Sequence, residues 1–258
     1  MRDRYGLTLE KKKLLVEGRL TSVLQDKRFP TISAYINHVV QDKTNAEAGT
    51  LLTRLTTNFT YFMREKVHYD YLLEHALPEL TPSIGDRDLR TWSAGCSSGE
   101  EPYTLVMTYD DYFGARKAEW DATVLATDIS PTVLRQAADA VYSPKSMEHL
   151  PRAYAEQYFV KLSPSEYRVT DALRREVVFR PFNLMDSPVP FRKKFHIIFC
   201  RNVMIYFSAP TRAALVQRFY DALVPGGYFF ISLAENLARG DTGFEMLRPS
   251  IYRKPGGR

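Results

Sequence analysis

The chain has 258 residues, of which 45% are hydrophobic and 25% charged, an ordinary balance for a globular protein. The net charge of +5 permits an acidic partner, but basic residues do not alternate with aromatic ones as in nucleic-acid grooves, which disfavours nucleic acid. No apolar run approaches the ~18 residues that span a bilayer, and the N-terminus lacks an apolar signal core, so we expect a cytoplasmic protein without direct membrane insertion. Two cysteines, Cys96 and Cys200, do not make a disulfide framework, and they do not make a zinc site because no other Cys, and no His at ligand spacing, accompanies them.

Residues 1–85 predict an all-helical domain, because their apolar residues recur at helical spacing. One helix is expected to begin after Thr31, whose hydroxyl suits an N-cap. The segment 81–86 contains Pro and Gly and is typical of a linker. We therefore predict a helical domain at 1–85 and a second domain at 86–258.

The stretch 89–103 combines a buried strand, a turn at Gly95–Gly99 and a helix that opens on Glu100 and Glu101. Such a turn lets a ligand approach the backbone closely. It lacks the glycine spacing of phosphate-binding loops, and two carboxylates at its mouth would repel a phosphate. A nucleoside with a cationic part, such as S-adenosylmethionine, fits better. The alternative is an ordinary strand-to-helix turn without a ligand.

Beyond this turn, strands and helices alternate, which predicts an α/β fold with a parallel sheet and crossover helices. The region after the second strand is too long for a simple crossover, so we predict a small inserted subdomain at about 143–176. The expected strands are 90–94, 123–127, 177–180, 196–200 and 228–233, with a terminal hairpin at 244–248 and 250–254.

Polar residues follow successive strands of this predicted sheet. Asp128 ends the second strand, where an acid can bind a ribose diol. The alternative for Asp128 is a helix cap, although Ser130 already fills that role. Asn183 and Arg201 follow the third and fourth strands. Alone, Asn183 would be a turn residue, and it is the shared sheet edge that predicts a ligand site.

Together with the segment TNFTYFMRE, this set resembles the chemotaxis-receptor glutamate O-methyltransferases, the CheR family. The resemblance spans nearly the whole chain, and the ordered set of motifs is far more specific than any single one. The matching stretches are 57–65, 92–103, 126–129, 182–184, 199–207 and 225–236.

The resemblance implies a Rossmann-like S-adenosylmethionine-dependent methyltransferase sheet with an N-terminal all-helical domain and a small inserted β-subdomain. It implies S-adenosylmethionine as cofactor, S-adenosylhomocysteine as product, and no metal. Catalytic roles are expected for Arg64 and Tyr206. The expected cofactor-binding residues are Asn58, Thr60 and Arg64 in a segment that closes over the cofactor, Gly95, Glu101 at the methionine part, Asp128 at the ribose, Asn183 and Leu184 at the adenine, and Cys200, Arg201 and Asn202 at the methyl-transfer end.

The implied substrates are glutamate side chains on the cytoplasmic domain of chemotaxis receptors, and we expect a monomer. A glutamate side chain is already a carboxylate at neutral pH, so no general base is required. Arg19 in the N-terminal helices is a candidate for contacting an acidic receptor helix, and the alternative is a solvated basic face.

At two places the sequence departs from the family pattern, and the roles of the family's residues there are not transferred to this chain. Leu233 and Ala234 replace a commonly found His and Ser. The subdomain turn KLSPSEYRV is shorter than the glycine-rich loop of members that bind a receptor's C-terminal pentapeptide, so we predict independence of that pentapeptide. Two alternatives stay open: a methyltransferase of the same fold acting on another substrate such as nucleic acid, and a signalling module that binds S-adenosylmethionine without catalysis.

Overall fold

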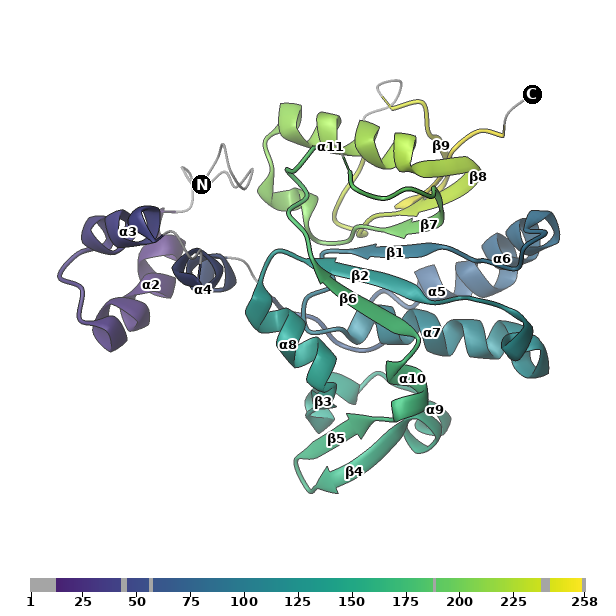
Figure 1. Cartoon of the computed structure of the whole chain (residues 1–258), viewed down its shortest axis with the longest axis horizontal. Helices are drawn as coiled ribbons and strands as arrows, with labels where there is room; N and C mark the ends of the chain where they lie inside the picture. The colour runs from purple at the N-terminus through teal and green to yellow at the C-terminus, as the bar shows by residue number, and fades with distance from the viewer. Residues whose placement is uncertain (1–12, 43–45, 56–57, 188, 238–241, 257–258) are drawn as a thin grey trace.

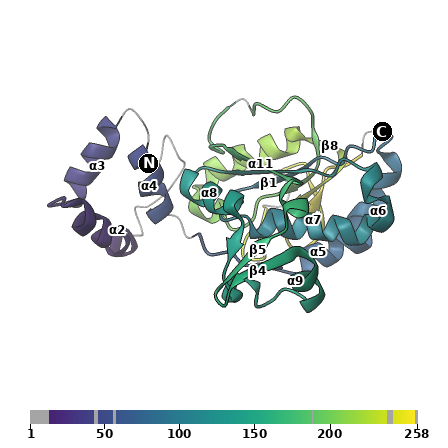
Figure 2. The ribbon, with the colours of Figure 1, turned by 60° about the horizontal axis from the view of Figure 1, so that its bottom comes forward.

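The computed structural model describes residues 13–42, 46–55, 58–187, 189–237 and 242–256. At one end of the molecule lie the helices α2 (Lys13–Lys27), α3 (Ile32–Gln41) and α4 (Ala46–Leu55), set apart from the sheet (Figures 1 and 2). Thr31 caps α3 by accepting a hydrogen bond from the Ala34 N–H, as the sequence predicts. These helices have a core of their own, formed by the buried side chains of Leu20, Val23, Tyr35, Val39, Leu51 and Leu55.

The central sheet has the strand order β6-β2-β1-β7-β8-β10-β9 and confirms the predicted α/β class (Figure 1). The first five strands in this order are parallel, and the pairs β8–β10 and β10–β9 are antiparallel. Since the chain proceeds from β1 to one side and later continues at β7 on the other, a crevice opens between their carboxyl ends. The strand bounds are β1 Thr91–Ala94, β2 Val124–Asp128, β6 Val177–Pro181, β7 Phe195–Phe199, β8 Leu223–Phe230, β9 Glu245–Arg248 and β10 Ile251–Arg253.

Both faces of this sheet are covered, as the alternating side chains of β7 illustrate. Ile197 and Phe199 belong to a core shared with α7 (Glu100–Phe113). Ile198 belongs to a second core shared with α11 (Ala209–Ala222). A strand that is buried on both faces has a continuous apolar sequence, such as FHIIFC, where the sequence predicts a strand at 196–200.

The segment 67–80 packs against the sheet rather than with the N-terminal helices. It comprises α5 (Val67–Tyr71), a π-helical turn (Leu72–Ala76) and α6 (Leu77–Leu80). The buried side chains of this segment lie in the same core as those of α7. The sequence predicts that this segment belongs to a domain ending at 85, whereas its buried side chains pack with those of α7. Helical periodicity shows that a helix buries one face, but not which neighbour covers it.

The inserted subdomain lies between β2 and β6 and forms a small antiparallel sheet with the order β3-β5-β4 (Figure 1). It follows α8 (Pro131–Asp139), and Pro164 and Ser165 form the turn between its longest strands. Its elements are β3 Val141–Tyr142, α9 Arg152–Tyr158, β4 Phe159–Ser163, β5 Glu166–Val169 and α10 Asp171–Arg174.

Candidate active site

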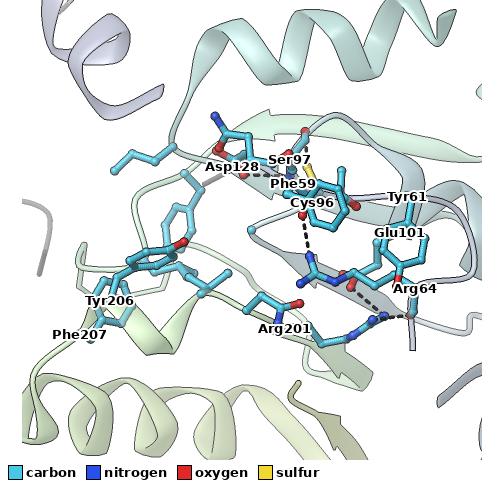
Figure 3. Close-up of a pocket in the computed structure, with 18 of the residues that line it drawn as sticks. Phe59, Tyr61, Arg64, Cys96, Ser97, Glu101, Asp128, Arg201, Tyr206 and Phe207 are labelled. Atoms are coloured by element: carbon cyan, nitrogen blue, oxygen red, sulfur yellow. Dashed lines mark hydrogen bonds and ion pairs between the residues drawn. The ribbon is translucent and has the colours of Figure 1, made fainter. Parts of the chain in front are cut away.

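A cleft opens at the carboxyl ends of β1, β2, β6 and β7, where the strand order predicts a ligand site (Figure 3). Its volume is about 1010 Å³, part of which is open to solvent. The lining residues are Asn58, Phe59, Thr60, Tyr61, Arg64, Tyr69, Gly95, Cys96, Ser97, Glu101, Asp128, Ile129, Phe182, Asn183, Leu184, Arg201, Asn202, Val203, Tyr206 and Phe207.

The glycine turn, residues 95–99, is fixed to the end of β2. The Gly95 and Cys96 N–H groups both donate to the Thr127 carbonyl, at 2.8 and 2.9 Å. Gly95 has φ of +89°, and a Cβ atom there would lie 2.4 Å from Val203 Cγ2. Only glycine therefore fits, because any other residue would have a strained backbone here and its Cβ would clash with Val203.

Asp128 is held in place by backbone donors on both carboxylate oxygens. Oδ2 accepts from the Ser97 N–H and Oδ1 from the Ser130 N–H, each at 2.9 Å. Burial raises the pKa of this carboxyl above its ordinary value, and these N–H groups act against the rise. Ser130 itself caps α8 through its hydroxyl, so Asp128 is not needed as the cap. Each oxygen retains acceptor capacity, which suits a pair of hydroxyl groups.

Arg201 connects Glu101, which lines the cleft, to the segment 58–65 that runs along the cleft. Its side chain is buried, with the residue 5% exposed, and its Nη1 lies 3.3 Å from the Glu101 carboxylate. Nη1 also donates to the Tyr69 hydroxyl at 3.0 Å, and Nε lies 3.3 Å from the Glu65 carboxylate. Nη2 donates to the Arg64 carbonyl. Most guanidinium donors are thus used within the protein, which makes Arg201 an organiser of the cleft.

Glu101 lies beside Arg201 and accepts a 2.7 Å hydrogen bond from the Ser93 hydroxyl. Burial raises the pKa of Glu101, while the charge of Arg201 acts against that rise. Glu100 instead binds the Ser98 hydroxyl at 2.7 Å and is buried away from the cleft. Glu101 therefore lines the cleft, whereas Glu100 does not.

The segment 58–65, here called the lid, runs along the cleft and carries Arg64 (Figure 3). The Asn58 side chain donates to the Thr53 carbonyl at 3.0 Å, and the Ser97 hydroxyl donates to the Asn58 carbonyl at 3.2 Å. Arg64 Nη1 donates to the Phe59 carbonyl at 2.6 Å. The lid is therefore attached both to α4 and to the glycine turn.

Tyr206 faces the cleft from the side opposite Arg64 (Figure 3). It ends a short 3₁₀ turn, Met204–Tyr206, after β7. The buried Glu235 carboxylate holds this loop by accepting from the N–H groups of Asn202 and Ile205 at 3.2 and 3.1 Å. It also accepts from the Ser232 N–H at 2.9 Å. Sequence reasoning assigned no role to Glu235; an acid directly after an apolar strand was the available signal.

The structure brings together most residues that the sequence nominates, with two outside the cleft. Cys200 has 0% exposure, packs in the core beneath α11, and does not line the cleft. Arg19 lies on α2 and donates to the Leu55 carbonyl at 2.7 Å, so it caps the end of α4. Met63, which stands where the family has Phe, is buried, and its N–H donates to the Thr104 hydroxyl at 3.4 Å.

Comparison with known proteins shows the family of this chain. The family model described as "CheR methyltransferase, SAM binding domain" matches residues 58–252. The chain belongs to the CheR methyltransferase family. It is 40% identical over 256 residues to the chemotaxis protein methyltransferase of Borreliella burgdorferi, covering 98% of this chain and 90% of that protein. It is 35% identical over 234 residues to a probable chemotaxis protein methyltransferase of Rhizobium etli, covering 89% and 86%. The Escherichia coli chemotaxis protein methyltransferase is 32% identical over 254 residues, covering 97% and 86%.

The CheR cleft has side chains that fit S-adenosylmethionine. Asp128 offers acceptors for a ribose diol, and Glu101 offers a buried negative charge for an ammonium group. Among the residues that the structure describes, no group of His, Cys, Asp and Glu could hold a metal ion. None of the described helices is long and apolar enough to cross a membrane.

Proposed function

We propose that this CheR-family enzyme transfers a methyl group from S-adenosylmethionine to glutamate side chains on the cytoplasmic domain of chemotaxis receptors. The products are glutamate methyl esters and S-adenosylhomocysteine. The observation that carries the proposal is the placement of Arg64 and Tyr206 on opposite sides of one cleft that Asp128 and Glu101 also line. The relatives named as chemotaxis protein methyltransferases indicate the class of substrate.

In this proposal the two buried acids hold the cofactor. Asp128 receives the ribose hydroxyls, and Glu101 receives the ammonium group of the methionine part. Asn183 and Leu184 line the same cleft after β6 and contact the adenine, while Asn58 and Thr60 contribute from the lid. Arg201 and Asn202 line the methyl-transfer end. When bound, S-adenosylmethionine supplies an electrophilic methyl group on a sulfonium that is already a good leaving group.

The protein's own task is to orient the reactants and exclude water. An ordinary glutamate has a pKa near 4.3, so the acceptor is ionised at neutral pH and no base has to remove a proton. Arg64 uses one N–H for the Phe59 carbonyl, and other N–H groups of its guanidinium can meet a carboxylate. Tyr206 orients the acceptor from the other side. Positioning of this kind contributes up to ~7–11 kcal/mol in favourable cases.

The test is incubation with methyl-labelled S-adenosylmethionine and purified receptor cytoplasmic domains. We expect label on the receptor that alkali releases, because carboxyl esters are alkali-labile, and loss of labelling in Arg64→Ala. Alkali-stable label on nucleic acid would instead identify the other substrate class. Cofactor binding without any transfer would identify a non-catalytic module.

We further propose that the enzyme acts in the cytoplasm as a monomer and does not depend on a receptor's C-terminal pentapeptide. The short Pro164–Ser165 turn between β4 and β5 supports this independence. Receptors with and without the pentapeptide are expected to be methylated at equal rates. A tail-dependent affinity for the free peptide would contradict the proposal. Arg19 is proposed to contact the receptor, and its bond to the Leu55 carbonyl means that Arg19→Ala must be checked for helix stability.

A further inference from the structure

The inserted subdomain makes direct contact with the back of the lid. Phe62, in the middle of the lid, has 0% exposure. Its ring lies 4.8 Å from the Tyr142 ring and 5.2 Å from the Phe159 ring, edge-on to both, with interplanar angles of 81° and 88°. The Phe62 N–H donates to the Ser146 carbonyl at 3.0 Å. One lid residue is therefore fixed to the subdomain through both its side chain and its backbone.

A neighbouring lid residue repeats this contact at the surface. The ring of Tyr61, which lines the cleft, lies 5.0 Å from the ring of the exposed His149. Figure 3 shows Tyr61 on the same side of the cleft as Arg64. Because Tyr61 and Arg64 flank Phe62 closely in sequence, fixing Phe62 restricts where both can lie.

Tyr142 connects the subdomain to the glycine turn as well. Its hydroxyl donates to the Ser98 carbonyl at 2.7 Å. Gly99 has φ of +96°, and a Cβ atom there would lie 2.9 Å from this hydroxyl, so the turn leaves room for it only as glycine. Burial raises the pKa of Tyr142 well above its ordinary value, which keeps the hydroxyl protonated as a donor.

The lid backbone needs such support. Met63 and Glu65 have positive φ angles of 61° and 57°, which cost of order 1 kcal/mol or more each and persist only where the surroundings impose them. On one side the Glu65 carboxylate meets Arg201 and the Leu233 N–H. On the other side the aromatic contacts of Phe62 hold the chain.

We propose that the inserted subdomain positions the lid for cofactor binding. In this proposal Tyr142 is the positioning residue that fixes the lid relative to the glycine turn. This inference deepens the proposed function, on which it rests, by giving the subdomain a role in the chain's own cofactor site. The subdomain residues Tyr142 and Phe159 do not line the cleft, and neither does the lid residue Phe62, so the subdomain acts on the cleft through the lid and the glycine turn.

The test compares full-length variants by calorimetric titration with S-adenosylhomocysteine and by steady-state kinetics. Tyr142→Phe removes only the hydroxyl, and the dissociation constant is expected to rise about fivefold, as for the loss of one hydrogen bond. Phe62→Leu is expected to raise it about tenfold through the lost aromatic contacts. In both variants the KM for S-adenosylmethionine should rise while kcat at saturating cofactor changes little. Amide hydrogen exchange of residues 58–65 should become faster.

Tyr154→Phe is the matched control, because Tyr154 belongs to the same subdomain but its hydroxyl binds Asp111 on α7 instead of the glycine turn. It should leave affinity and exchange of the lid unchanged. His149→Ala removes the exposed ring that contacts Tyr61, and the dissociation constant is expected to rise about threefold. This variant keeps the test decisive if Phe62→Leu does not fold.

Wild-type affinity in both Tyr142→Phe and His149→Ala would overturn the inference while the cofactor site stood. Failure of the wild-type protein to bind S-adenosylhomocysteine would instead refute the proposed function itself. A fall in kcat with unchanged KM would also contradict a positioning role in cofactor binding.

Discussion

At the scale of single residues, the buried acids make cofactor binding sensitive to pH. Burial raises the pKa values of both Glu101 and Asp128, and only their carboxylate forms accept hydroxyl and ammonium donors well. On acidification, affinity for S-adenosylhomocysteine is therefore expected to fall at a higher pH than for carboxyls with ordinary pKa values. Asp128→Asn should raise the dissociation constant about tenfold or more, as for the loss of hydrogen bonds to a charged group.

Calorimetric titration across a pH series, with wild type and Asp128→Asn side by side, measures this effect. The free energy of unfolding has the opposite dependence on pH. A raised carboxyl pKa means that the folded state binds more protons than the unfolded state. The stability of wild type relative to Asp128→Asn therefore falls as pH rises through that pKa. If both proteins bound S-adenosylhomocysteine equally strongly at neutral pH, Asp128 would not be a cofactor-binding residue.

The residues that sequence reasoning located are those fixed by strand ends and family motifs, such as Asp128 and Arg201. Cys200 was placed at the methyl-transfer end, yet side chains alternate along an extended chain, and Cys200 points into the core beneath α11. Glu65 and Glu235 were missed because most of their partners lie in remote segments: the Arg201 guanidinium and the Leu233 N–H for Glu65, and the Asn202 and Ile205 N–H groups for Glu235. Apart from the position of Glu235 shortly after an apolar strand, such bonds leave no pattern in the local sequence.

At the scale of elements, the loop after β7 depends on one carboxylate. Glu235 binds the N–H groups of Asn202 and Ile205 on this loop and that of Ser232 after β8. Glu235→Gln keeps the shape but replaces an acceptor oxygen with a donor that faces an N–H group. Since Tyr206 belongs to this loop, we expect kcat to fall about tenfold, and by more than cofactor affinity falls.

Receptor methylation rates and the dissociation constant for S-adenosylhomocysteine, measured on the same preparations, separate these effects. Glu245→Gln is a suitable control, because Glu245 is exposed on β9 and pairs with Arg253. Unchanged turnover in Glu235→Gln, with an unchanged melting temperature, would show that the loop does not need this carboxylate.

The strands themselves were largely predictable, and β8 shows where the pattern failed. A strand was expected at 228–233, after the residues Pro225–Gly227, whereas β8 begins at Leu223 and ends at Phe230. Leu223 pairs with Phe195 and Tyr228 with Ile197, so the register shifts and a bulge absorbs the extra residues. Proline and glycine predict a turn locally, but a neighbouring strand can still hold them in a sheet.

At the scale of the whole molecule, the packing defines two bodies. Among the residues that the structure describes, the core of α2, α3 and α4 shares none with the cores of the sheet. The bodies meet where α4 lies against α8, with a hydrogen bond between the Thr53 and Ser130 hydroxyls. The segment 67–80 belongs to the sheet body, and the family model likewise begins at 58. The positions of the helices could be predicted from the sequence. The element against which each helix packs could not, because that element lies far away in the chain.

This division predicts the behaviour of two truncated proteins. A fragment of residues 56–258 keeps the lid, Tyr69 and the whole sheet core, so it should fold and bind S-adenosylhomocysteine within about tenfold of the full chain, the cost of losing one or two hydrogen bonds at Thr53. A fragment of residues 86–258 lacks Tyr69, Leu72 and Leu77 and exposes the apolar face of α7, so it should aggregate or remain unfolded. Circular dichroism measures whether each fragment folds, and calorimetric titration measures whether it binds S-adenosylhomocysteine. A well-folded, ligand-binding 86–258 fragment would place the boundary at the linker, whereas failure of 56–258 alone would make α4 part of the catalytic body.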